Sequence, residues 1–226
     1  MWDKTEETIT IPATDMEHYT DHPDVIFVCV KGYSLDETIP FIKQIAKKTT
    51  IVIPVLNIYG TGGKMQKQLP ELLVTDGCIY VSANIKEPGR LLQHGQILRI
   101  VFGVRDKAES RPELKEIQKD FCDSHIDGIL SENIRRETLE KFSYVSPIGA
   151  AGSTTTPQPQ TSERRRSQRT LQNHDKRNRS TRRSHGSPIP ERHGRCKFKI
   201  LSNLAPEATT SMQRDIMAGN SPKSTD

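Results

Sequence analysis

The chain lacks the features that mark membrane and secreted proteins. Aromatic residues make up 5% of its 226 residues and hydrophobic residues 33%, so we expect part of the chain to remain outside any compact core. No apolar run approaches the roughly 20 residues that a membrane-spanning helix needs. The polar opening Met1–Glu7 is unlike a signal peptide. The sequence therefore favours a cytoplasmic protein.

Disulfide and metal motifs are also missing. The cysteines form no CxxC pair, which suits a reducing compartment better than a disulfide framework. No histidine pair has metal-ligand spacing, and His193 with Cys196 alone makes no site, so we expect no metal. Cys29 lies inside an apolar run and is therefore predicted to be a small core residue.

Glycine-rich phosphate-binding motifs are absent as well. No GxGxxG turn, the signature of dinucleotide-binding folds, occurs in the chain. The segment Gly60–Lys64 is rich in glycine, but it lacks the Gly-x4-Gly-Lys-Ser/Thr spacing of a phosphate loop. We therefore predict no phosphate site there.

Positive charge is concentrated in one segment, Ser153–Lys197. It has 12 Lys/Arg and 3 Asp/Glu, a charge of +9, whereas the whole chain carries +5, which leaves 5 minus 9, or −4, for the rest. Because this segment has no hydrophobic periodicity, it is predicted to be disordered. Its arginines can bind nucleic-acid phosphates nonspecifically. No aromatic residue is interleaved for base stacking, which argues against a specific nucleic-acid partner.

What the sequence does contain is a strand–helix–strand pattern in Asp24–Gly60. Asp24–Val30 is an unbroken apolar run, typical of a strand buried on both faces. Ser34–Glu37 matches a capping box, and Pro40 predicts a kink or a later helix start. The apolar residues of this helix recur at helical spacing: Leu35, Ile39, Ile42 and Ile45.

The second apolar run of this pattern is Thr50–Leu56. A strand, a helix and a strand form a right-handed crossover, in which the two strands are parallel. Lys31 and Asn57 follow the two strands directly. Because open α/β sheets bind ligands at the carboxyl ends of their strands, both residues are candidate binding groups.

Shorter patterns follow along the chain. We expect a short helix in 61–70, a strand in 71–74, two antiparallel strands (Cys78–Asn84 and Gln96–Phe102) around the turn Glu87–Arg90, an amphipathic helix at Pro112–Cys122, an extended link at Asp127–Leu130, and a longer helix from Ser131 or Glu132 toward Ala151.

Five local motifs in one order resemble the ketopantoate reductase (2-dehydropantoate 2-reductase) family. They are Val28–Tyr33, Pro54–Asn57, Pro88–Gly89 with His94–Gly95 and Phe102–Gly103, Asn133–Phe142, and Thr210–Ile216. The resemblance covers roughly 8–152 and 198–220. It implies an α/β fold with a Rossmann-type NADP-binding domain, followed by an all-helical domain. The implied reaction is NADPH-dependent reduction of 2-dehydropantoate to pantoate, a step toward coenzyme A.

The resemblance also assigns roles to four residues. Lys141 matches the lysine that polarises the ketone and donates the proton. Asn57 matches an asparagine near cofactor and substrate, Lys31 a lysine near the cofactor, and Ser211 a serine that contacts substrate. Without the resemblance, Lys141 also fits a solvated helix lysine, Asn57 a turn-forming asparagine and Lys31 a strand-end lysine.

The sequence departs from the family pattern in three places. The segment matching the first strand and the GxGxxG turn is missing, so we expect an N-terminal truncation and impaired NADPH binding. Val145 and Gly149 stand where the family often has asparagines. The pattern is lost between about 153 and 197, which we interpret as a frameshift, and a substrate-binding glutamate is missing after Gly219.

The expected organisation has four parts: an incomplete Rossmann-type domain (1–130), the start of a helical substrate domain (131–152), a disordered basic segment (153–197) and a remnant of the helical domain (198–226). The chain is thus expected to be a fragment that no longer turns over substrate and that assembles as a homodimer. The alternatives left open are a noncatalytic interaction module and a nonspecific nucleic-acid binder that uses the arginine-rich segment.

Overall fold

The computed structural model describes residues 6–153. Ser211 and the expectations for 154–226 lie outside this range. The chain divides into two compact units, Met1–Arg135 and Arg136–Asp226, and each is described by itself.

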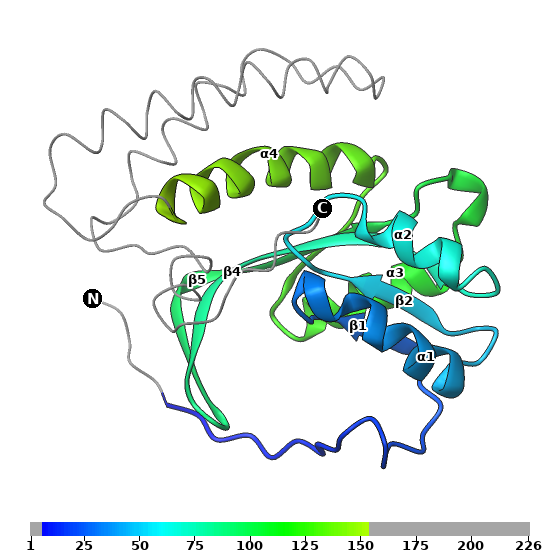
Figure 1. The fold of residues 1–226 in the computed structure, drawn as a ribbon, viewed down its shortest axis with the longest axis horizontal. Helices are drawn as coiled ribbons and strands as arrows, with labels where there is room; N and C mark the ends of the chain where they lie inside the picture. The colour runs from blue at the N-terminus through cyan, green and yellow to red at the C-terminus, as the bar shows by residue number, and fades with distance from the viewer. Residues whose placement is uncertain (1–5, 154–226) are drawn as a thin grey trace, which may run out of the picture. The chain divides into compact units, whose positions relative to one another are not determined.

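The first unit combines helices with strands, and three of the strands, β3 to β5, follow one another directly (Figure 1). Its elements are β1 (Val25–Val28), a 3-10 turn (Gly32–Ser34), α1 (Leu35–Ile45), β2 (Ile51–Pro54), α2 (Thr61–Gln68), β3 (Leu73–Val74), β4 (Asp76–Glu87), β5 (Arg90–Gly103), a 3-10 turn (Lys107–Glu109), α3 (Glu113–Asp123) and β6 (Asp127–Leu130). The last described helix, α4 (Ile134–Ser153), continues into the second unit.

The strands form two three-stranded sheets. In the first, β1, β2 and β3 are parallel and lie in that order, as the predicted crossover requires. In the second, β5 pairs antiparallel with β4 and parallel with β6. The predicted antiparallel pair is therefore confirmed. Gly77 brings β4 against the end of β2, because a Cβ on Gly77 would lie 2.8 Å from the Pro54 carbonyl oxygen.

Helices cover both faces of the parallel sheet. One hydrophobic cluster joins α1 and α2 to Val52 and Val74, and a second joins α3 to Ile51 and Ile53. Because neighbouring strand residues point to opposite faces, β2 contributes side chains to both clusters. All four of its residues are buried, which is typical of a strand covered on both faces.

The helix predicted after the first strand is confirmed. Its four apolar residues are 1–4% exposed. The 3-10 turn Gly32–Ser34 runs directly into α1, so the Ser34 side chain makes no capping hydrogen bond. The expected capping box is therefore wrong. The helix begins at Leu35 and continues through Pro40.

Two predictions for the first strand are wrong. β1 is not buried on both faces, because within the described residues it is the edge strand of its sheet, and Phe27 is 43% exposed. Cys29 is exposed and is not a core residue, because β1 ends one residue earlier, at Val28.

Two later elements also differ from expectation, one in its type and the other in its first residue. Asp127–Leu130 is a true strand, β6, since it pairs with Arg99–Phe102. The long helix begins at Ile134, after Ser131 donates its amide hydrogen to the Phe102 carbonyl oxygen at 2.8 Å.

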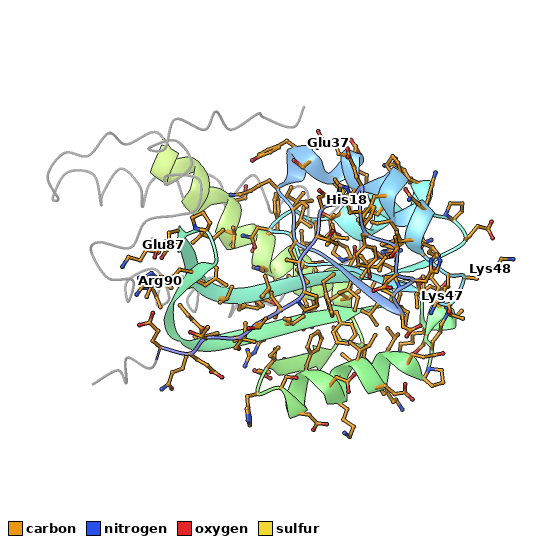
Figure 2. All side chains as sticks on the ribbon, turned by 90° about the horizontal axis from the view of Figure 1, so that it is seen from below. His18, Glu37, Lys47, Lys48, Glu87 and Arg90 are labelled. Atoms are coloured by element: carbon orange, nitrogen blue, oxygen red, sulfur yellow. The ribbon has the colours of Figure 1, made fainter. Side chains whose placement is uncertain are left out.

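The β4–β5 hairpin closes at the predicted Pro–Gly turn. Gly89 has φ +77, a conformation that glycine adopts without steric cost. Glu87 and Arg90 flank the turn and pair at 3.2 Å (Figure 2). Within residues 6–153, no helix is both long enough and apolar enough to cross a bilayer.

Candidate functional site

The carboxyl ends of β1 and β2 place Lys31 and Asn57 in equivalent positions. Val28 pairs with Pro54, so Lys31 lies three positions after one partner and Asn57 three positions after the other. The Val55 amide donates to the Val28 carbonyl oxygen at 3.1 Å. The two chain segments therefore leave the sheet side by side, at the edge where α/β sheets bind ligands.

The two segments also touch beyond the sheet. A Cβ on Gly32 would lie 2.3 Å from Ile58 Cδ1, so the neighbour of Lys31 packs against the neighbour of Asn57. The Lys31 and Asn57 side chains are both exposed. The structure thus brings these two predicted residues to one accessible edge.

The first turn of α1 is tied to α2 beside this edge. The Asp36 carboxylate accepts from Lys64 Nζ at 3.1 Å and from Gln68 Nε2 at 3.3 Å. The hydrogen bond from Lys64 holds the pKa of Asp36 below its ordinary value. The lysine of the glycine-rich segment therefore faces a carboxylate of its own chain.

A carboxylate also lies at the start of α2. Its N-cap residue, Gly60, has φ +80 and no side chain to cap the helix. The Thr61 hydroxyl donates to the Ile58 carbonyl oxygen at 3.0 Å, and the Asp76 carboxylate lies against the Gly62 backbone, with Oδ1 2.3 Å from where a Cβ on Gly62 would be. A phosphate at this helix start would meet that negative charge.

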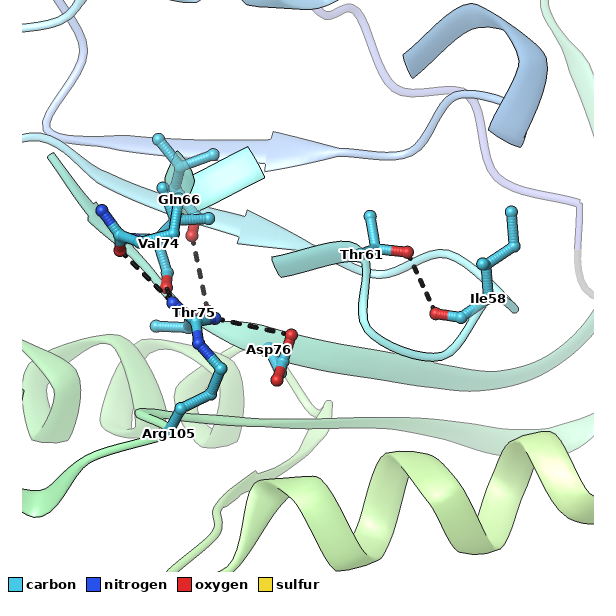
Figure 3. Close-up of polar contacts among 8 residues, drawn as sticks. Ile58, Thr61, Gln66, Val74, Thr75, Asp76 and Arg105 are labelled. Carbon is cyan, nitrogen blue, oxygen red and sulfur yellow. Dashed lines mark hydrogen bonds and ion pairs between the residues drawn. The ribbon is translucent and has the colours of Figure 1, made fainter. Parts of the chain in front are cut away.

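Asp76 and Arg105 form a buried pair behind α2 (Figure 3). Their side chains are 8% and 11% exposed, and Arg105 Nη1 lies 3.5 Å from Asp76 Oδ1. Arg105 Nη2 donates to the Val74 carbonyl oxygen at 2.8 Å and to Gln66 Oε1 at 3.3 Å. This network joins α2 to the junction of β3 and β4.

Burial dominates the electrostatics of this pair. Desolvation raises the pKa of Asp76, and the charge of Arg105 opposes that rise only in part. Burial and the charge of Asp76 also raise the pKa of Tyr59, while Arg135 lowers it. Sequence reasoning missed Asp76, because its partners Gly62 and Arg105 are distant along the chain and no local motif joins them.

Lys141 lies in the second unit, on α4. It is 5% exposed and shares one helical face with Thr138, which is 7% exposed. A lysine is rarely buried to this extent unless its charge has a partner. Its burial does not fit the solvated helix lysine that is the ordinary alternative. The fourth candidate, Ser211, lies outside the described residues.

Within residues 6–153, no group of three or more His, Cys, Asp or Glu side chains is arranged to hold a metal ion. The chemistry available at the strand ends of the first unit is therefore that of an exposed ammonium, an exposed amide and nearby backbone groups.

Comparison with known proteins gives a similarity to one family model and a similar fold. Residues 3–107 match the family model described as ketopantoate reductase PanE/ApbA. An uncharacterized oxidoreductase, YkpB of Bacillus subtilis (strain 168), is 23% identical over 132 residues, which are 58% of this chain and 43% of that protein. The chain therefore spans less than half of this relative.

Solved structures show the same fold. A dimeric ketopantoate reductase from Staphylococcus aureus is similar at TM-score 0.69 and 21% identity, over 90% of this chain and 67% of the other. A 2-dehydropantoate 2-reductase from Methylococcus capsulatus gives 0.72 and 19%, over 91% and 66%. D-mandelate dehydrogenase in complex with NADH gives 0.64 and 17%, over 88% and 67%.

The α/β arrangement of parallel strands and covering helices is thus the Rossmann-like arrangement of ketopantoate reductases. The similarity to the ketopantoate reductase PanE/ApbA family model thus extends over residues 3–107.

Proposed function

We propose that the chain is a ketopantoate reductase-like oxidoreductase that uses NADPH to reduce 2-dehydropantoate to pantoate. The observation that carries the proposal is the equivalent placement of Lys31 and Asn57 after the paired residues Val28 and Pro54. An NADPH-binding part would comprise 1–130, and a helical substrate part would begin at 131.

The residues at the strand ends fit a nicotinamide dinucleotide. The exposed Lys31 ammonium is complementary to the phosphates of NADPH, and the exposed Asn57 amide can both donate and accept hydrogen bonds. The bound cofactor would supply the hydride. The complex of the similar D-mandelate dehydrogenase with NADH supports a cofactor of this class.

Lys141 and Asn57 would act on the substrate. As the ketone is reduced, its oxygen gains negative charge, and the Lys141 ammonium would stabilise that oxygen and protonate it. Asn57 would orient the substrate, and Ser211 would bind it as well. The burial of Lys141 supports this role, because water competes less for a buried ammonium.

Turnover by this chain is expected to be slow or lost. No GxGxxG turn occurs in its 226 residues, and in dinucleotide-binding folds these glycines let the pyrophosphate approach the backbone. We propose that NADPH binding is impaired for the same reason. Binding is therefore a more sensitive test of the function than catalysis.

The decisive experiment is a fluorescence titration with NADPH. We expect saturable binding that Lys31→Ala weakens about tenfold, or about 1.4 kcal/mol. Lys48→Ala is the matched control, because Lys48 is also exposed but precedes β2 (Figure 2). Absence of saturable binding to the unmodified chain, or equal effects of the two substitutions, would count against the proposal.

The similar Staphylococcus aureus enzyme is described as dimeric, and we propose a homodimer here too. Size-exclusion chromatography with light scattering gives the mass in solution. A mass of about twice the 25.5 kDa of one chain is expected, and a monomer at all concentrations would contradict the assembly.

A further inference from the structure

The loop that carries Asn57 runs from Val55 to Gly60 and joins β2 to α2. We propose that Asp76 is a positioning residue that fixes this Asn57 loop by accepting the Gly62 amide hydrogen at the start of α2. The inference rests on the proposed function, because Asn57 receives its role in cofactor and substrate binding there.

The helix start has no ordinary cap. The first amide groups of a helix have no partner within the helix, and a polar side chain at the N-cap usually accepts from one of them. In α2 the N-cap is Gly60, which has no side chain. Asp76, on β4, places a carboxylate oxygen beside the Gly62 backbone from another element.

The contact is so close that only glycine fits. A Cβ on Gly62 would lie 2.1 Å from the Thr75 carbonyl oxygen, 2.3 Å from Asp76 Oδ1 and 2.7 Å from Arg105 Nη1. A Cβ on the next residue, Gly63, would meet no atom within 4 Å. The backbone of α2 therefore rests on the β3–β4 junction at Gly62 and not one residue further on.

The carboxylate is itself held in place. Arg105 faces Asp76 at 3.5 Å, and its other nitrogen is bonded to the Val74 carbonyl oxygen at 2.8 Å. Gln66 Oε1 accepts from the Val74 amide at 3.0 Å. Because Arg105 is itself held by Val74 of β3 and by Gln66 of α2, Asp76 has little freedom to follow a moving loop.

The Asn57 loop is thus fastened at both ends. At its start, the Val55 amide is bonded to β1 through the Val28 carbonyl oxygen. At its end, Gly62 lies against Asp76, and the Thr61 hydroxyl is bonded back to the Ile58 carbonyl oxygen. Asn57 lies between these anchors, so losing the second one frees its side chain to move.

The test compares neighbouring glycines by hydrogen exchange and NADPH titration of the full chain. Gly62→Ala forces the helix start away from Asp76, and we expect the amides of 57–64 to exchange at least about tenfold faster. NADPH binding should weaken by a similar factor. Gly63→Ala, the matched control, should not speed exchange and should leave binding unchanged.

Two variants of Asp76 test the same contact from the other side. Asp76→Ala removes the acceptor and should speed exchange in 57–64 as Gly62→Ala does. Asp76→Asn keeps an oxygen that can accept the Gly62 amide hydrogen, so it should restore slow exchange, and this variant also serves if Asp76→Ala does not fold. Faster exchange with Asp76→Asn equal to that with Asp76→Ala would overturn the inference.

Unchanged exchange in 57–64 of Gly62→Ala would also overturn it. Failure of the proposed function looks different: the unmodified chain then binds no NADPH, while the exchange of its Asn57 loop still responds to Gly62→Ala and Asp76→Ala.

Discussion

At the scale of single residues, Lys141 has the most unusual environment among the candidates. It is 5% exposed on α4, although a lysine side chain ordinarily keeps its charge in water. A stability role and a proton-donor role both explain a buried ammonium, and substitution separates them, because only the second requires a large loss of rate.

We expect Lys141→Ala to lower the rate of ketopantoate-dependent NADPH oxidation by about 10²–10⁴-fold, the usual contribution of a general acid. The assay needs a high protein concentration so that slow turnover is measurable. Lys119→Ala is the control, because Lys119 is 74% exposed and pairs with Asp123 on α3. A similar loss in both variants, with circular dichroism unchanged, would contradict a specific role of Lys141.

Asp76 predicts a pH dependence of stability. Burial raises its pKa above the ordinary value of 3.8, so the folded protein holds this proton at pH values where the unfolded chain has lost it. The free energy of unfolding contributed by Asp76 therefore falls as pH rises from about 4 toward the raised pKa. Urea unfolding of wild type and Asp76→Asn at several pH values measures this contribution to the free energy of unfolding. A difference between the two proteins that does not decline across this window would contradict the sign.

Residues at strand ends could be predicted from sequence, whereas long-range partners could not. Lys31 and Asn57 follow apolar runs, so local pattern places them at one edge. Asp76 acts on Gly62 through a contact between distant segments, and the residues next to Asp76 in the sequence do not predict that contact. Cys29 was misjudged because the apolar run continues past the hydrogen-bonded strand.

At the scale of elements, α3 and β6 pack so closely that a glycine is required between them. A Cβ on Gly128 would lie 2.5 Å from Phe121 Cβ and 2.9 Å from Phe121 Cδ2. Phe121 in turn stacks edge-on against Phe102 at 5.6 Å between ring centroids. Crowding at Gly128 would therefore reach the centre of the second hydrophobic cluster.

Gly128→Ala should lower the free energy of unfolding by about 1–3 kcal/mol, the usual cost of overpacking. Gly63→Ala provides a contrast, because its methyl group meets open space in α2. That substitution should raise stability by about 0.5–1 kcal/mol through the lower entropy of the unfolded chain. Urea unfolding of both variants measures the two changes in the free energy of unfolding. Equal changes would show that the contact between Gly128 and Phe121 is loose.

Elements with strong periodicity were predicted well, and short ones were not. The faces of α1 and α3 were clear, since their apolar residues recur every three or four positions. β6 has only four residues, which is too few to show a period. Its identity as a strand comes from pairing with β5, a tertiary contact that its own residues do not specify.

At the scale of the whole molecule, the charge is strongly asymmetric. The segment 153–197 carries +9 and the remainder −4. Such a distribution favours weak attraction to any polyanion. A dinucleotide-binding function and nonspecific nucleic-acid retention can therefore occur in one chain, and salt distinguishes them.

Binding of a mixed-sequence DNA duplex should be detectable at low salt and lost at moderate salt, because it depends on counterion release. Gel-shift titrations over a series of salt concentrations measure the slope. Deletion of 153–197 should abolish the shift. Binding that persists at high salt, or that distinguishes one sequence from another, would instead favour the nucleic-acid alternative.

Because Cys29 is exposed, a chemical reporter can be attached just after the end of β1. This thiol lies two positions before Lys31, whereas Cys78 is buried. After Cys122 and Cys196 are replaced by serine, an environment-sensitive dye attached to Cys29 would sit beside the proposed cofactor position. A change in its emission on adding NADPH would report occupancy directly, without any need for turnover.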